Sequence, residues 1–188
     1  MSGQNIVKPN PEGIAASINA TKKGRGLPPV HLWNPPFCGD IDMRIARDGT
    51  WFYEGSKITR PGLVGLFSSI LKLEDGKFFL VTPVEKVGIT VEDAPFVAVD
   101  FEQNGADIVF ETQVGDSVTV GPQNAVRIDV AEDGEPSPYL HVRAGLEALI
   151  DRKSFYRLVE VGAHHEGMFG IWSGGAFFPF VESAALQD

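Results

Sequence analysis

The residues best suited to chemistry gather in one stretch of the chain, from Pro28 to Gly55. It contains His31, Trp33, the only cysteine, and five charged residues, which are Asp40, Asp42, Arg44, Arg47 and Asp48. A carboxylate beside a guanidinium can orient a polar ligand. A carboxylate that reaches a histidine can act as a general acid or base. The stretch therefore predicts either ligand binding or acid–base chemistry.

Four prolines restrict the backbone around the aromatic part of this stretch. Pro28-Pro29 and Pro35-Pro36 stand on either side of His31, Trp33 and Asn34. Proline disfavours helix at its own position and at the residue before it. We therefore expect an extended, non-helical segment whose side chains either cover the core or form one wall of a ligand pocket.

Apolar and charged residues alternate from residue 40 to residue 45, which predicts a half-buried strand. Asp40, Asp42 and Arg44 then share its polar face, either as a surface charge pair or as a pair that orients a ligand. Asp48-Gly49 predicts a hairpin into a returning strand over residues 51–53.

The remaining candidate ligand contacts lie at two element boundaries. Arg60 precedes a predicted helix that begins at Pro61. Thr82, Glu85 and Lys86 lie where a predicted strand is interrupted, and a backbone can approach a ligand there. The predicted ligand-binding residues are His31, Trp33, Asn34, Asp40, Asp42, Arg44, Arg60, Thr82, Glu85 and Lys86.

Other motifs are less specific. Residues 22–26 (KKGRG) match a phosphate cradle in composition but lack the spacing of a phosphate-binding loop, so we interpret them as a linker. Cys38 is interpreted as a structural cysteine. His164-His165-Glu166 has no third ligand at a metal-binding spacing, so no metal site is predicted, and the sequence identifies no cofactor and no catalytic residue.

Composition and charge limit the possible partners. The formal net charge is −9, which argues against a nucleic-acid partner. Residues 1–60 carry 8 Lys+Arg against 5 Asp+Glu, whereas residues 61–188 carry 8 against 20. This asymmetry either attracts an anionic ligand to the first half or helps the two halves to dock. Apolar runs fall short of a membrane span, the N-terminus has no signal-peptide pattern, and the single cysteine fits a reducing cytoplasm.

The rest of the chain predicts short elements in two groups. We expect helices over residues 13–20, 61–71 and 143–150, and a further helix around Phe155 and Leu158. Short strands are expected over residues 78–81, 87–91, 96–99, 108–110, 117–120 and 125–128, and a closing hairpin over residues 169–180. Residues 1–27 are expected to form an arm with a short helix, residues 28–93 a first domain, and residues 94–188 a second domain.

A short sequence pattern that occurs twice suggests an internal duplication. Residues 60–66 (RPGLVGL) and 143–149 (RAGLEAL) share the pattern R-x-G-L-x-x-L, and Asp48-Gly49 and Asp133-Gly134 precede them. Duplicated α+β units leave a cleft between them, and such clefts often bind ligands.

The run from His31 to Phe67 and the later segment LVTPVEKVGITVEDAPF resemble the bacterial family known as domain of unknown function 1285, and the likeness continues to residues 169–180. The resemblance implies a duplicated two-domain core whose second part is similar to pleckstrin-homology-like folds. It also implies a nucleotide-based ligand at the domain interface and a role in signal transduction. It implies no catalytic residues.

These observations predict an α+β protein of two tandem related domains, each an antiparallel sheet with a packed helix. The predicted function is that of a cytoplasmic regulatory module that binds a small anionic ligand between its halves. Two alternatives stay open. One is a hydrolase or transferase using Asp40 or Asp42 with His31 or His164, and the other is a protein-interaction module.

Overall fold

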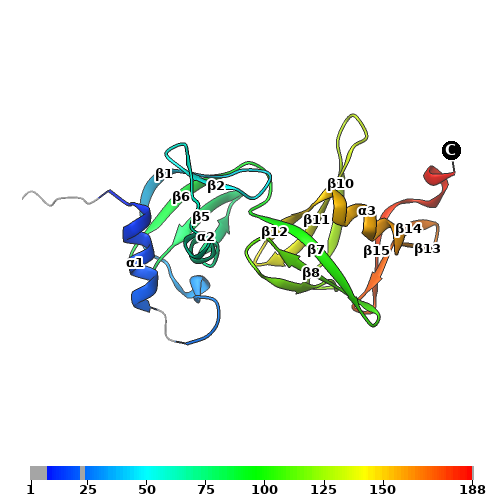
Figure 1. Cartoon of the computed structure of the whole chain (residues 1–188), viewed down its shortest axis with the longest axis horizontal. Helices are drawn as coiled ribbons and strands as arrows, with labels where there is room; N and C mark the ends of the chain where they lie inside the picture. Colours follow the sequence, from blue (N-terminus) through cyan, green and yellow to red (C-terminus); the bar gives the residue numbers. More distant parts are fainter. Residues whose placement is uncertain (1–7, 22–23, 188) are drawn as a thin grey trace, which may run out of the picture. The chain divides into compact units, whose positions relative to one another are not determined.

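The computed structural model of the chain describes residues 8–21 and 24–187. Two compact units are distinguished, Met1–Ala46 with Thr50–Glu92 (unit 1) and Arg47–Gly49 with Asp93–Asp188 (unit 2). Figure 1 traces unit 1 in blue to green and most of unit 2 in green to red. Within the described ranges, no helix is both long and apolar enough to cross a membrane.

Unit 1 combines a six-stranded sheet with two short helices. Its elements are α1 (Pro11–Thr21), the 3-10 turn η1 (Val30–Leu32), β1 (Phe37–Ile45), β2 (Trp51–Tyr53), β3 (Ser56–Lys57), α2 (Pro61–Ser68), β4 (Leu71–Glu74), β5 (Lys77–Val81) and β6 (Lys86–Val91). Helix α1 begins after Asn10, whose side-chain oxygen accepts a hydrogen bond from Gly13 N at 2.8 Å, the usual N-cap arrangement. Ile14 and Ile18, four residues apart on one face, are fully buried.

Unit 2 contains a second six-stranded sheet, followed by a helix and a small three-stranded sheet. Its elements are β7 (Phe96–Asn104), β8 (Asp107–Thr112), β9 (Ser117–Thr119), β10 (Val126–Val130), β11 (Pro136–Arg143), β12 (Leu146–Ile150), α3 (Arg152–Glu160), β13 (Ala163–His165), β14 (Met168–Ser173), β15 (Ala176–Glu182) and the 3-10 turn η2 (Ser183–Leu186). Asp151 caps α3 by accepting a hydrogen bond from Ser154 N at 2.8 Å.

Each unit has its own core, built on the inward face of its strands. In unit 1 the alternation in β1 buries Ile41, Met43 and Ile45, and Trp51 and Phe67 pack beside each other with ring centroids 6.1 Å apart. In unit 2 Phe96, Phe110, Leu140 and Leu146 are almost completely buried.

The two six-stranded sheets have the same topology. Their strand orders are β3-β2-β1-β6-β5-β4 and β9-β8-β7-β12-β11-β10. In both, the first and last strands pair in parallel, β1 with β6 and β7 with β12, and the other neighbours are antiparallel. The tandem, duplicated two-domain architecture expected from the sequence is therefore present, with sheets that are mixed rather than purely antiparallel.

The sequence match that suggested the duplication does not join equivalent elements. Residues 143–150, expected to be helical, form the end of β11, a two-residue turn and strand β12, whereas residues 61–68 form helix α2. The equivalent of the turn at Asp133-Gly134 is Asp75-Gly76, which also joins the fourth and fifth strands of its sheet, rather than Asp48-Gly49. Helix α2 lies between the third and fourth strands of unit 1, and the corresponding connection in unit 2 is the short turn at residues 121–124.

The structure corrects one further expectation, and another stays a prediction. The proline-rich segment is not wholly extended, because Val30–Leu32 make one 3-10 turn between the proline pairs. The likeness of the second domain to a pleckstrin-homology-like barrel stays a prediction of the resemblance.

Candidate functional site

A groove in unit 1 lies along helices α1 and α2. Its volume is about 560 Å³, and its lining comes from α1, from the segment after it and from the length of α2 with its two caps. The lining residues are Ala15, Asn19, Gly26, Pro28, Arg60, Gly62, Leu63, Gly65, Leu66 and Ser69. Helices α1 and α2 contact each other within the unit, so the groove belongs to the packing of these two helices.

The start of α2 is open to this groove. Pro61 occupies the first helical position and has no N–H, and the N-cap residue Arg60 makes no side-chain capping bond. A β-carbon placed on Gly62 or Gly65 would meet no atom within 4 Å, so the helix surface is uncovered at both positions. Leu63 N and Val64 N donate to Arg60 O, so Gly62 supplies the N–H of the first turn that makes no such bond, and this end of the helix carries partial positive charge. The groove is therefore suited to a negatively charged group.

Arg60 adds a full positive charge at the same place. Its side chain is exposed, and among the described residues it has no hydrogen-bond or ion-pair partner. The guanidinium has the planar fork of N–H donors that matches a carboxylate or phosphate, and the Gly62 N–H lies at the same helix start.

A smaller cavity of about 100 Å³ shares Gly26 and Pro28 with the groove. It is lined by the half-buried Trp33 and by Arg25, an exposed cation that likewise has no partner within the described part of the chain. The Trp33 backbone is fixed by its N–H, which donates to Val30 O at 3.1 Å. An aromatic ring next to a cationic groove can stack on a planar ligand.

The other candidates of the proline-rich segment lie at the surface. His31 is within η1, and both His31 and Asn34 are exposed. No hydrogen bond or ion pair joins His31 to another described residue. The structure thus places Trp33, but not His31 or Asn34, among the residues that line a cavity.

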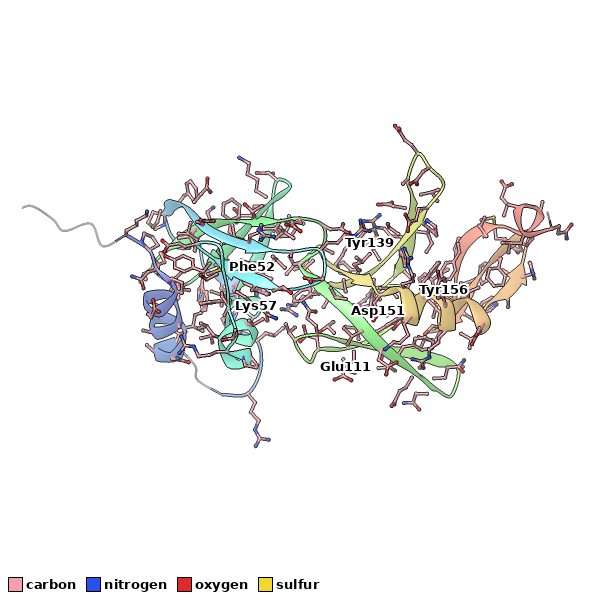
Figure 2. All side chains as sticks on the ribbon, turned by 45° about the horizontal axis from the view of Figure 1, so that its top comes forward. Phe52, Lys57, Glu111, Tyr139, Asp151 and Tyr156 are labelled. Atoms are coloured by element: carbon pink, nitrogen blue, oxygen red, sulfur yellow. The ribbon has the colours of Figure 1, made fainter. Side chains whose placement is uncertain are left out.

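Strand β1 presents Asp40, Asp42 and Arg44 on one face, as the alternation predicts, but outside both cavities. The Arg44 guanidinium is paired with Glu92 and lies 4.3 Å from the centroid of the Phe52 ring. Figure 2 shows Phe52 on the strands of unit 1. The Arg44 side chain is therefore already engaged by residues of unit 1. Neither Asp40 nor Asp42 forms a side-chain hydrogen bond with a described residue.

The strand interruption at residues 82–85 is a tight turn held by its own side chain. The hydroxyl oxygen of the buried Thr82 accepts hydrogen bonds from Val84 N and Glu85 N, at 3.3 and 3.1 Å. Burial raises the pKa of the Glu85 carboxyl. Thr82 therefore stabilises the turn between β5 and β6.

Lys86 follows this turn and is paired. Its Nζ lies 2.9 Å from Glu74 Oε2 and 4.8 Å from the centroid of the Phe79 ring. Hydrogen bonds from Lys72 and then from Lys86 lower the pKa of the Glu74 carboxyl. This arrangement is that of a structural ion pair on the sheet.

The residues required by the enzyme alternative are not joined by hydrogen bonds. In unit 1, none links His31 to Asp40 or Asp42 in the described ranges. In unit 2, His164 Nδ1 is 2.7 Å from Ser183 Oγ, and its ring packs against Phe169 with centroids 5.1 Å apart. The catalytic arrangement stays a prediction without a geometric basis.

Several lining residues of the groove were not foreseen. Asn19 and Ser69 belong to no motif, and only the contact between α1 and α2 places them in one groove. Arg25 belongs to the KKGRG run that was interpreted as a linker, and Lys22 and Lys23 of that run lie outside the described residues. Two signals in the sequence point to the smaller cavity, the glycine-rich basic composition of this run and the proline-flanked Trp33.

Comparison with known proteins places this architecture in a family. Residues 28–94 match the model described as domain of unknown function (DUF1285), N-terminal domain, and residues 95–180 match protein of unknown function (DUF1285), C-terminal domain. A comparison with curated proteins gives no match.

Two solved structures are similar to the chain. A DUF1285 family protein from Silicibacter pomeroyi DSS-3 is 59% identical over 94% of this chain and 98% of its own, with a TM-score of 0.85. A DUF1285 family protein from Shewanella baltica OS155 is 32% identical over 63% of this chain and 90% of its own, with a TM-score of 0.51. Because the family models span both domains and these structures share their sequence and fold, the chain belongs to the DUF1285 family.

Proposed function

We propose that the chain is a regulatory module that binds a small anionic molecule in the groove between helices α1 and α2. The observation that carries this proposal is Arg60, an exposed guanidinium without a partner in the described ranges, at the open start of α2. The negative group of the ligand contacts the Arg60 guanidinium and the Gly62 N–H, because Pro61 has no N–H and Leu63 N and Val64 N donate to Arg60 O. This arrangement supplies charge-assisted hydrogen bonds without side-chain rearrangement.

The adjoining cavity favours a ligand that also carries a planar ring. Trp33 and Arg25 line that cavity, and it shares the lining residues Gly26 and Pro28 with the groove. A nucleotide combines the two features, a phosphate for Arg60 and a base that stacks on Trp33. The site between the two halves stays a prediction from the sequence, and the proposal rests on unit 1 alone.

A thermal-shift screen of the full chain tests the proposal. The probes are mononucleotides, cyclic nucleotides, dinucleotides and coenzyme A thioesters. A ligand at 100 times its dissociation constant adds about 2.7 kcal/mol to the free energy of unfolding. For a chain of this size each kcal/mol raises the unfolding temperature by roughly 2–4 °C, so a specific ligand gives a clear shift.

Two variants assign the shift to the groove. Arg60→Ala is expected to weaken binding about tenfold, because a hydrogen bond to a charged group is lost. Lys57→Ala removes an exposed cation on β3, outside the groove, and is expected to leave the affinity unchanged. A ligand that binds Arg60→Ala as tightly as the parent contradicts the proposed site. An absence of shifts across the panel contradicts the nucleotide class.

A further inference from the structure

A second groove, of about 680 Å³, lies within unit 2. It is formed by the turn between β10 and β11, by β11 and the end of β12, and by the first turns of α3. Its accessible apolar lining comes from Pro136, Leu149 and Phe155, whereas Pro138 and Ile150 of the lining are buried. Tyr156 completes this lining, and 61% of its surface is exposed although the ring is large. Figure 2 labels Tyr156 and Asp151 near helix α3.

The cations of this groove are already engaged. Arg152 Nη2 lies 2.7 Å from Glu135 Oε1. Arg47 Nε lies 3.3 Å from Asp93 Oδ2, and Arg47 Nη2 donates to Ser137 Oγ at 3.2 Å. No cation of the groove is therefore available to an anionic ligand without breaking a contact.

Two of the carboxylates that line the groove, Asp133 and Asp151, each accept a single hydrogen bond. Asp133 accepts one hydrogen bond, from Glu135 N at 3.0 Å, and Asp151 accepts one from Ser154 N at 2.8 Å. Neither carboxylate has an ion-pair partner in the part of the chain that the structure describes. Both can therefore accept further hydrogen bonds from a cation.

Unit 2 as a whole is negatively charged, as are these two carboxylates. Unit 2 carries 17 Asp+Glu against 6 Lys+Arg, a formal charge of −11, whereas unit 1 carries 8 against 10. A surface with this excess repels anions and attracts cationic partners over a Debye length. Charge complementarity thus favours a basic occupant, and the apolar lining requires that it also present aliphatic side chains.

We infer that this groove is the docking site for a basic, extended peptide segment of a partner protein. In an extended segment, alternate side chains point in opposite directions, so one set packs against Leu149, Phe155 and Tyr156. Lysine or arginine side chains at the edges of the groove pair with Asp133 and Asp151. The groove is separate from the one assigned to the anionic ligand, so each proposal can fail without the other.

An NMR titration of the isotope-labelled full chain tests this inference. The probes are two peptides of matched sequence, Lys-Leu-Lys-Leu-Lys-Leu and Glu-Leu-Glu-Leu-Glu-Leu, which in an extended conformation place all their leucines on one face. The basic peptide is expected to shift the amide signals of Ser137, Leu149, Ile150, Arg152 and Tyr156, and its affinity is expected to fall as salt is raised. The acidic peptide is expected to shift none of them.

Three variants separate the groove from a general attraction to an acidic protein. Tyr156→Ala is expected to lower the affinity for the basic peptide about tenfold, because an exposed aromatic contact is lost. Asp133→Lys is expected to lower it about fivefold. Glu160→Lys changes the charge equally, at the end of α3 and outside the groove, and is expected to leave the affinity near that of the parent.

Three outcomes of the peptide experiments overturn the inference, and a fourth is a change seen without peptide. The first three are signals that shift over the whole acidic surface, equal shifts with both peptides, and an equal effect of Asp133→Lys and Glu160→Lys. Groove signals that shift with protein concentration alone, without peptide, would assign the groove to a second copy of the chain and also overturn it.

Discussion

Tyr139 is a residue whose ionisation is linked to the fold. Its ring is buried, its hydroxyl donates to Asp93 Oδ1 at 2.6 Å, and Arg127 lies 4.5 Å from the ring centroid. Burial, followed by the hydrogen bond to Asp93, raises the pKa of Tyr139 to about 12. The folded state thus favours the neutral phenol, and this stabilisation is complete below the ordinary tyrosine pKa of about 10 and is lost as the pH rises from there through 12.

The expected result is a pH-dependent difference between the parent and Tyr139→Phe. The free energy of unfolding of the parent, relative to the variant, falls by about 1 kcal/mol between about pH 9 and pH 11. Urea denaturation at several pH values measures this. A difference that is constant over the range would show that Tyr139 ionises with an ordinary pKa.

At Gly170 and Gly88, the energetic cost of substitution by alanine depends on which atoms the new methyl group would meet. A β-carbon at Gly170 would overlap the carbonyl oxygen of Phe178 and lie 2.8 Å from Pro179 Cα, both backbone atoms of the paired strand. A β-carbon at Gly88 would overlap a carboxylate oxygen of Asp40, which is the end of a mobile, exposed side chain.

We therefore predict that Gly170→Ala destabilises unit 2 by about 3 kcal/mol, because the strand pair must separate to admit the methyl group. Gly88→Ala is expected to cost less than about 1 kcal/mol, because Asp40 can rotate away. Denaturation curves of both variants measure the difference. Equal costs would mean that the strands β14 and β15 adjust as readily as one side chain does.

Among the elements, the tight turns determine how the hairpins close. Ala144-Gly145 and Asp75-Gly76 are two-residue turns in which both residues have positive φ, 48° and 79° in the first and 49° and 75° in the second. Such turns favour Asn or Asp followed by Gly, because a β-carbon is strained in this region and a short polar side chain offsets the strain.

Opposite substitutions at the two turns are expected to have opposite effects. Ala144→Asn should raise the free energy of unfolding by about 0.5–1 kcal/mol, and Asp75→Ala should lower it by a similar amount. Thermal denaturation of the two variants tests the signs. The same sign in both would show that contacts of the side chains, and not backbone strain, dominate these turns.

These turns also show which elements could be predicted from the sequence. Alternating burial in β1 and the glycine turns were sufficient to place most strands. The structure of residues 143–150 could not be predicted in this way, because the apolar residues of this short run fit a helix as well as a strand. In the structure, Gly145 has a positive φ and lies in the turn of a hairpin. The parallel pairs β1–β6 and β7–β12 join residues far apart in the chain and leave no local signal.

The same limit applies to the candidate site. Arg60 could be selected because it is a cation directly before Pro61, and a proline at the first helical position marks a helix start. Its groove could not be predicted, because Asn19 and Ser69 meet only through the packing of α1 against α2. Nor could the sequence show that Arg44 and Lys86 are paired with Glu92 and Glu74.

For the whole molecule, one topology occurs twice with contrasting charge. The two six-stranded sheets share their strand order, yet unit 1 has a formal charge of +2 and unit 2 of −11. Like charges at this density raise the energy of a compact state. The same fold therefore forms in unit 2 against a larger charge repulsion than in unit 1. The sign of each charge also matches the proposed ligand class, anionic for unit 1 and basic for unit 2.

This contrast predicts that salt stabilises the two units unequally. Raising NaCl from about 20 mM to about 300 mM shortens the Debye length from roughly 20 Å to 6 Å and screens the repulsion within unit 2. Hydrogen exchange at a core amide of each unit, Leu80 in β5 and Leu140 in β11, reports local stability separately. Protection at Leu140 is expected to increase severalfold with salt, while protection at Leu80 changes little. Choline chloride should act as NaCl does, since screening depends on ionic strength. An equal increase at both amides would mean that charge repulsion does not limit the stability of unit 2.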